Sequence, residues 1–76
     1  MSKLPVLSAS EAIAAFQKAG FAVVRTTGSH HIMKREGWRF LLSVPFHAGQ
    51  DLKPGTLRGL IRAAGMTIDD FAKLLG

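Results

Sequence analysis

The sequence contains no cysteine, which excludes a disulfide framework and a thiolate metal site. It has no apolar run near the ~18 residues that a membrane helix needs, and its first residues lack the apolar core of a signal peptide. These absences fit a cytoplasmic protein with no membrane partner. Acidic residues are also few, with five Asp and Glu against ten Lys and Arg, for a net charge of +5. This charge predicts a polyanionic partner, either nucleic acid or an acidic protein.

The few acidic residues are too scattered to hold a catalytic metal. Two Mg²⁺ ions need a cluster of carboxylates, and Asp51, Asp69 and Asp70 do not form one. The sequence also has no HExxH pair of histidines and no glycine-rich nucleotide loop. We therefore expect any chemistry of this chain to need neither a metal nor a cofactor.

Apolar residues make up 47% of the chain, enough for one core and too much for disorder. We expect a single domain over residues 1–76, without repeats or linkers. In chain order, the local signals predict a helix over about 9–19, strands over 21–27, 30–35 and 38–44, a helix from Pro54 to Gly65, and a short helix after Thr67. The order α-β-β-β-α predicts an α+β fold, a three-stranded antiparallel sheet covered on one face by helices.

The turn at Gly28-Ser29, followed at once by His30 and His31, is the stretch around which the chain is organised. Glycine accepts positive φ and serine can satisfy a local backbone group, so the turn delivers a side chain to a fixed place. Histidine can both accept and donate a proton near neutral pH, because its unperturbed pKa is ~6.5. On spacing alone, the pair can also be two strand histidines without chemistry, one packed and one solvated.

Hairpin geometry separates the two histidines. A two-residue loop at Glu36-Gly37 places His31 opposite Leu42 and His30 opposite Ser43. Because side chains alternate between the faces of a sheet, we expect His31 on the apolar core side and His30 on a polar, basic, open face. A slip of the register by one residue would exchange them.

Trp38 and Phe40 alternate along the expected third strand. The same two-residue loop pairs Phe40 with Met33. We therefore expect both aromatic side chains in the core, rather than on a surface that stacks nucleic-acid bases.

Four sequence blocks carry a resemblance to a known family. They are Gly28-Ser29-His30, Val44-Pro45-Phe46-His47, Leu52-Lys53-Pro54-Gly55-Thr56-Leu57 and Ile61-Arg62-Ala63-Ala64-Gly65-Met66. In this order and spacing they resemble the HicA toxins, the YcfA-like partners of the HicB antitoxins, over about Ser10 to Leu75. The resemblance implies a double-stranded-RNA-binding-domain-like fold and ribosome-independent cleavage of mRNA by a metal-free nuclease. Where many members have an aromatic residue two positions after the histidine pair this chain has Met33, which we expect to affect base stacking more than cleavage.

The resemblance also implies roles for single residues. The histidine after the Gly-Ser turn is the implied catalyst, which is His30 here, acting as general base on a ribose 2′-OH or as general acid on the leaving 5′-oxygen. Some members carry it one place later, so His31 is the alternative. His47 is either an accessory acid or base, a phosphate contact or a plain loop histidine. The basic residues expected to contact RNA, unless they are simply solvated, are Lys34, Arg39, Lys53, Arg58 and Arg62. Lys53 is the best placed, because it precedes a helix.

The resemblance thus predicts an mRNA interferase, an endoribonuclease toxin of a type II toxin–antitoxin system, acting on single-stranded RNA and inhibited by a HicB-type antitoxin. Two other functions stay open: a non-catalytic RNA-binding module of the same fold, and an adaptor whose basic face docks an acidic protein. The histidine after the turn favours the nuclease, because a module that reads RNA shape needs Lys, Arg and 2′-OH contacts but no histidine there.

Overall fold

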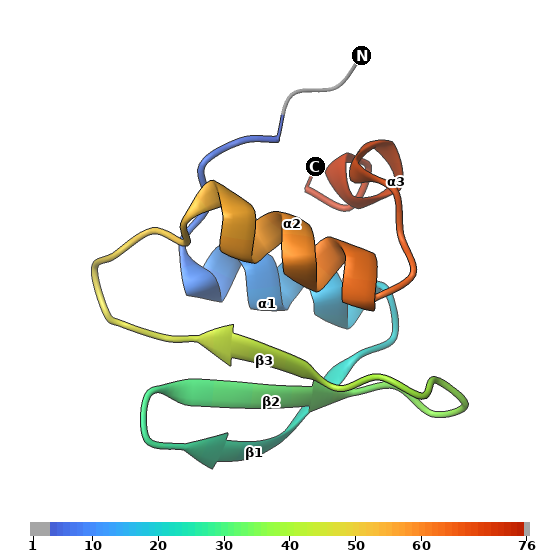
Figure 1. Cartoon of the computed structure of the whole chain (residues 1–76), viewed down its shortest axis with the longest axis horizontal. Helices are drawn as coiled ribbons and strands as arrows, with labels where there is room; N and C mark the ends of the chain where they lie inside the picture. The colour runs from blue at the N-terminus through green and yellow to red at the C-terminus, as the bar shows by residue number, and fades with distance from the viewer. Residues whose placement is uncertain (1–3, 76) are drawn as a thin grey trace.

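The computed structural model describes residues 4–75 as a three-stranded antiparallel sheet with helices on one face (Figure 1). Residues 1–3 and 76 lie outside the described part. The two ends of the predicted domain, and the first residues considered as a signal peptide, therefore fall outside it as well. The elements are α1 (Ala9–Lys18), β1 (Ala22–Thr27), β2 (His30–Lys34), β3 (Leu42–Pro45), α2 (Pro54–Ala63) and α3 (Ile68–Ala72). None of these helices is long and apolar enough to cross a membrane.

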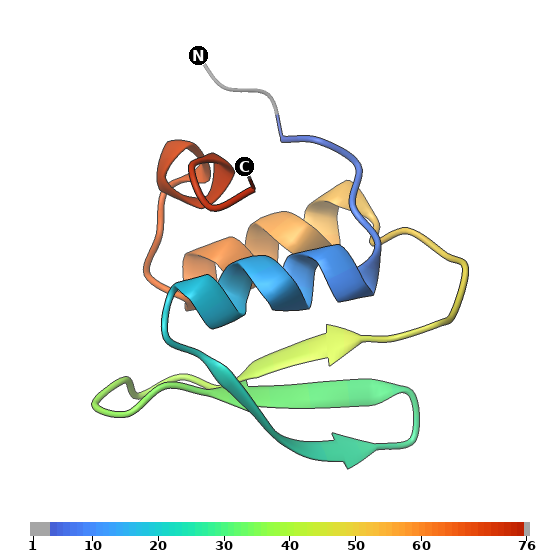
Figure 2. The same cartoon turned by 180° about the vertical axis from the view of Figure 1, so that it is seen from behind.

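The sheet has the order β1-β2-β3, and α1 and α2 lie side by side over one of its faces. The short helix α3 lies beyond α1 and α2, on the side away from the sheet (Figure 2). The predicted α+β class and the α-β-β-β-α order are therefore confirmed. The largest fully buried side chains come from all three helices and from β2 and β3, and they are Phe16, Phe71, Met33, Leu42, Leu57, Ile61 and Val44.

The start of α1 forms as its sequence predicts. Ser8 Oγ accepts a hydrogen bond from the Glu11 amide over 3.2 Å, and the Glu11 carboxylate accepts one from the Ser8 amide over 3.0 Å. The backbone hydrogen bond from Ser8 lowers the pKa of the Glu11 carboxyl below its usual value. Just before this cap, Leu7 O accepts from the Leu52 amide over 2.8 Å. This bond fastens the loop after β3 to the entry of α1.

The hairpin between β2 and β3 differs from the predicted one. The third strand was expected over 38–44, but β3 begins only at Leu42. His31 consequently pairs with Val44 instead of Leu42, a shift of two residues. Because the side-chain period of a strand is two, an even shift leaves every side chain on its predicted face. His31 stays on the side of the helices, and His30 stays on the opposite side.

The type of turn explains the shift. The predicted turn forms, since the Trp38 amide donates to Arg35 O over 3.0 Å, but Gly37 alone has positive φ there (+80°). Tight two-residue hairpins need positive φ at the first central residue, which is Glu36 here, and other turns splay the two strands. Pairing therefore lapses after the turn and resumes only at Leu42.

The residues looped out by this shift include Phe40 and Leu41. The Phe40 side chain is 50% exposed and that of Leu41 is 53% exposed. The prediction that Phe40 pairs with Met33 in the core is therefore wrong, because the ring lies beyond the region of strand pairing. Trp38 does pack against the core, half-buried, and its Nε1 donates to Ala63 O over 2.8 Å. The two aromatics that were predicted to behave alike thus have different environments.

Candidate functional site

The turn between β1 and β2 is held in place by the segment that follows β3. Gly28 adopts φ +53°, which favours glycine, and no atom lies within 4 Å of the position that a Cβ would take. Ser29 O accepts a hydrogen bond from the Phe46 amide. The backbone of the turn is therefore held by the bond between Ser29, just before β2, and Phe46, just after β3. This bond supports the first residue of β2.

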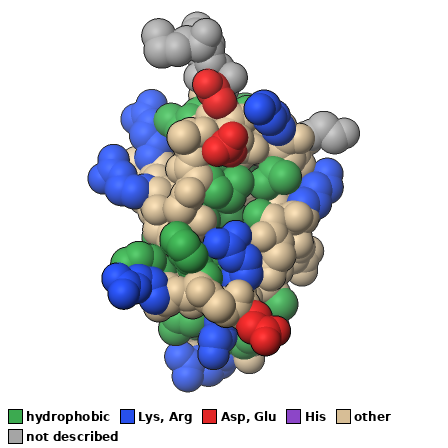
Figure 3. Space-filling view, turned by 90° about the vertical axis from the view of Figure 1, so that its right-hand side faces the viewer, with side chains coloured by type: hydrophobic (Ala, Val, Ile, Leu, Met, Phe, Trp, Pro, Cys, Tyr) green, Lys and Arg blue, Asp and Glu red, His purple; other side chains and the backbone are tan. Residues whose placement is uncertain are grey.

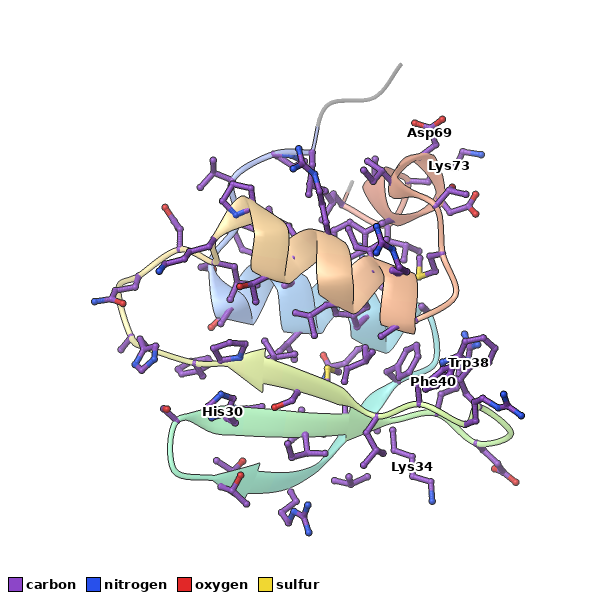
Figure 4. All side chains as sticks on the ribbon, viewed as in Figure 1. His30, Lys34, Trp38, Phe40, Asp69 and Lys73 are labelled. Atoms are coloured by element: carbon purple, nitrogen blue, oxygen red, sulfur yellow. The ribbon has the colours of Figure 1, made fainter. Side chains whose placement is uncertain are left out.

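His30 is that first residue, and its side chain is exposed. It pairs with Thr27 in β1 and with Pro45 in β3, not with Ser43 as predicted. Its imidazole makes no hydrogen bond to any other residue in the range 4–75. In Figure 4 it lies at the end of the sheet where the chain turns from β1 into β2. The ring nitrogens of His30 are consequently available to a ligand.

His31 has a different environment, as the alternation of side chains predicts. Its half-buried ring lies 4.6 Å from the Phe46 ring, centroid to centroid, at an interplanar angle of 37°. Its Nδ1 is buried and has no hydrogen-bond partner within the described residues. The neighbours differ from the expected ones, since Phe46 stacks on this ring and Phe40 does not approach it. The His31 ring thus packs against Phe46 with one of its nitrogens enclosed.

A cavity of about 250 Å³ lies at the same end of the sheet as His30. Pro45, the β3 partner of His30, is part of its wall. The complete lining is Pro45, His47, Gln50, Asp51, Leu52, Lys53 and Thr56. Both His47 and Lys53 are exposed, and Lys53 is the N-cap residue of α2 without a side-chain cap hydrogen bond. The fold therefore brings two predicted site residues, His47 and Lys53, to the end of the sheet that carries His30.

The other predicted RNA-binding residues lie elsewhere. Lys34 is at the far end of β2, where its side chain points away from the helices (Figure 4). Arg39 belongs to the hairpin beyond it. Arg58 and Arg62 are exposed on α2, one helical turn apart. All of these side chains are exposed and lie away from His30, and their contact with RNA remains a prediction.

No group of three or more His, Cys, Asp or Glu residues within positions 4–75 is arranged to hold a metal ion. Asp51 lies on the cavity wall, whereas Asp69 and Asp70 lie in the first turn of α3. The prediction of metal-independent chemistry remains a prediction, which chelation tests directly.

Sequence reasoning missed Phe46 as part of this site. Phe46 packs on His31 and its amide donates to Ser29 O, although it lies between the predicted third strand and second helix and was given no role. Gln50 and Thr56 on the cavity wall were missed as well. The available signal was the block Val44-Pro45-Phe46-His47, whose strand-ending proline and following aromatic residue mark an ordered segment.

Comparison with known proteins identifies the family. The family model described as the HicA toxin of bacterial toxin–antitoxin systems matches residues 9–66. A search of curated proteins gives no match to this chain. The matched span runs from the start of α1 past the end of α2, and it includes the turn, all three histidines and the whole cavity wall. Because the match covers well over half of the sequence, the chain belongs to the HicA toxin family of bacterial toxin–antitoxin systems.

Proposed function

We propose that this chain is an endoribonuclease toxin that cleaves single-stranded mRNA, with His30 as its general acid or base and a HicB-type antitoxin as its inhibitor. The observation that carries the proposal is the exposed imidazole of His30, which has no hydrogen-bond partner among residues 4–75 and follows a turn bonded to Phe46. Membership of a toxin family supports the biological role. The net charge of +5 supports an anionic substrate.

The proposed reaction is an attack of the ribose 2′-oxygen on the adjacent phosphorus. The bond between phosphorus and the 5′-oxygen breaks, so the products carry a 2′,3′-cyclic phosphate and a 5′-hydroxyl. The adjacent 2′-OH is the nearest nucleophile, which makes the reaction intramolecular. His30 removes the proton of the 2′-OH or supplies one to the 5′-oxygen, and His47 is the candidate for the other transfer. The ammonium group of Lys53 is placed to attract the phosphate charge.

A defined single-stranded RNA incubated with the purified chain tests this proposal. A denaturing gel should show discrete fragments, and end-group analysis should find the cyclic phosphate and the 5′-hydroxyl. Fragments with a 3′-hydroxyl and a 5′-phosphate would contradict the mechanism. Binding of the RNA without any cleavage would favour the non-catalytic module of the same fold.

Removal of divalent metal should leave cleavage unchanged. The described residues offer no carboxylate or imidazole cluster for a divalent ion, so the proposed proton transfers involve side chains and ribose only. The measurement compares cleavage rates in EDTA with rates in added Mg²⁺ or Mn²⁺. Loss of activity in EDTA with recovery on adding either ion would show that the chain uses a carboxylate site.

A HicB-type antitoxin should bind the chain and cover His30 together with the basic residues near it. An acidic partner would associate quickly with a chain of this charge, and the rate of association should fall as salt is added. The measurement is RNA cleavage by the toxin alone and by the complex saturated with antitoxin. Full activity on RNA in the saturated complex would exclude occlusion as the means of inhibition.

A further inference from the structure

The hairpin tip, residues 35–41, is firmly attached to the rest of the domain. Its Trp38 indole donates to Ala63 O at the end of α2 over 2.8 Å. Its Arg35 guanidinium lies 4.9 Å from the Trp38 ring centroid and 4.8 Å from that of Phe21, and it donates to Ala19 O over 3.2 Å. These contacts reach both α2 and the chain after α1. The tip is thus a preorganised surface rather than a free loop.

This tip presents an aromatic ring that the core does not use. Phe40 is half-exposed, meets Trp38 edge to face at 6.0 Å between centroids, and has the Arg39 guanidinium 5.8 Å from its own centroid. Figure 3, which shows this end of the molecule, has Lys and Arg side chains among and beside the hydrophobic ones, with Asp or Glu side chains at the upper part and the lower right. An exposed aromatic ring beside cations is the combination with which proteins bind single-stranded nucleic acid without sequence preference, because every base has a π-face.

The helix α2 connects the tip to the end of the molecule that carries His30. Its N-cap Lys53 borders the cavity next to the β3 partner of His30, and its last residue Ala63 accepts the bond from Trp38. A helix of this length spans ~15 Å. Arg58 and Arg62 are exposed on this helix, one helical turn apart, between Lys53 and the end that meets Trp38.

We propose that Phe40, with Arg39, is a base-stacking subsite for single-stranded RNA, at the opposite end of α2 from His30. The inference rests on the proposed function and deepens it, because the RNA that is cleaved at His30 would also bind at Phe40. The phosphates pass along Arg58 and Arg62, and one base stacks on the exposed face of Phe40. The subsite accepts any base, since it offers a ring and a guanidinium rather than a pattern of hydrogen-bond groups.

Binding of RNA to the His30→Ala protein, which keeps the RNA intact, tests the subsite. Adding Phe40→Ala should raise the Kd for an RNA of about ten nucleotides by ~5–100-fold, because stacking of one base is lost. For a dinucleotide the change should be smaller, since it is too short to contact both the His30 end and the tip across the ~15 Å of α2. Phe40→Trp should keep or tighten binding. A 2-aminopurine base in the longer RNA should be quenched by the parent protein and not by the Phe40→Ala variant.

Leu41→Ala is the matched control, because Leu41 is equally exposed on the same tip but has no aromatic ring. Equal losses of RNA affinity in Leu41→Ala and Phe40→Ala would contradict the stacking proposal, and so would an unchanged Kd in Phe40→Ala. Weaker antitoxin binding with unchanged RNA binding in Phe40→Ala would assign the tip to the protein partner instead. If the wild-type chain cleaves RNA and the Phe40→Ala variant binds the longer RNA normally, the subsite proposal is wrong and the proposed nuclease function stands. A wild-type chain that neither binds nor cleaves RNA overturns both proposals.

Discussion

His30→Ala is expected to lower the rate of RNA cleavage by ~10²–10⁴-fold, the usual contribution of a general acid or base. Growth inhibition should disappear with it. The fold should persist, because the exposed His30 side chain has no hydrogen-bond partner within residues 4–75 and contributes little to packing. The expected loss of stability is under ~1 kcal/mol. The measurement is a single-turnover cleavage rate beside a thermal melt, and RNA binding should remain.

His31→Ala is the matched control, because it changes the neighbouring residue on the other face of the same strand. It removes the ring that stacks on Phe46, so stability should fall by ~1–2 kcal/mol. Removal of the enclosed, unpartnered Nδ1 offsets part of the packing loss. Cleavage at a permissive temperature should be largely retained. If His30→Ala still cuts RNA while His31→Ala does not, the catalytic residue is His31.

His47→Ala is expected to give a partial loss of rate. Its side chain is exposed on the cavity wall beside Lys53, at the end of the sheet that carries His30. Loss of a second acid or base should lower the rate by less than loss of His30, because water can take over one of the two proton transfers. A His47→Ala protein with wild-type rates at all substrate concentrations would make His47 a loop histidine.

Local signals predicted the elements, because each of them rests on groups that are close in sequence. The helix expected from about residue 9 begins with the reciprocal caps of Ser8 and Glu11, and Gly65 follows α2 with φ +74°. Thr67 caps α3, accepting from the Asp70 amide over 3.0 Å. In each case a side chain caps a backbone amide within four residues, or a glycine adopts the positive φ that ends a helix. Such helix ends can therefore be predicted from the sequence alone.

The register of the hairpin was beyond such local reasoning. Whether the strands pair directly after Glu36-Gly37 depends on the φ of Glu36, which is not positive here, and the residue types in the turn do not fix that angle. The shift happened to be even, which is why the assignment of His30 and His31 to opposite faces is confirmed although their strand partners were wrong. The exposure of Phe40 follows from the same shift, and no local pattern indicated it.

The cavity was also out of reach of the sequence. Its walls come together because the Phe46 amide binds Ser29 O and the Leu52 amide binds Leu7 O. Backbone hydrogen bonds of this kind involve no particular side chain and join segments far apart in the chain. The sequence could therefore supply His47 and Lys53 as candidates, but not their position at the end of the sheet where His30 begins β2.

Gly65→Ala is expected to destabilise the domain far more than the same change at another glycine of similar conformation. A Cβ at Gly65 would lie 2.6 Å from Trp38 Cη2 and 2.7 Å from Cζ2, so the indole must move. The indole is held by its bond to Ala63 O and by the Arg35 guanidinium, and moving it disturbs both. Such overpacking costs ~1–3 kcal/mol, in addition to ~1–2 kcal/mol for positive φ at alanine.

Gly49→Ala isolates the second of these costs. Gly49 has φ +78°, close to the +74° of Gly65, but no atom lies within 4 Å of its Cβ position. Urea unfolding of both variants, analysed with a common m-value, should therefore place Gly65→Ala below Gly49→Ala by ~1–3 kcal/mol. Equal stabilities would show that Trp38 yields without cost and that the tip is not rigid.

The contact between Gly65 and Trp38 also links stability to the proposed RNA subsite. In a Trp38→Leu background the additional penalty of Gly65→Ala should vanish, because the clashing atoms are gone, and a double-mutant cycle measures that coupling. Gly65→Ala should in addition weaken binding of the longer RNA, since displacement of Trp38 moves the Phe40 ring that packs on it. Gly49→Ala lies outside the tip and should leave the effect of Phe40→Ala on that binding unchanged. Because Gly65 has no Cβ, the Trp38 indole can pack beside it, and the exposed Phe40 ring packs on that indole.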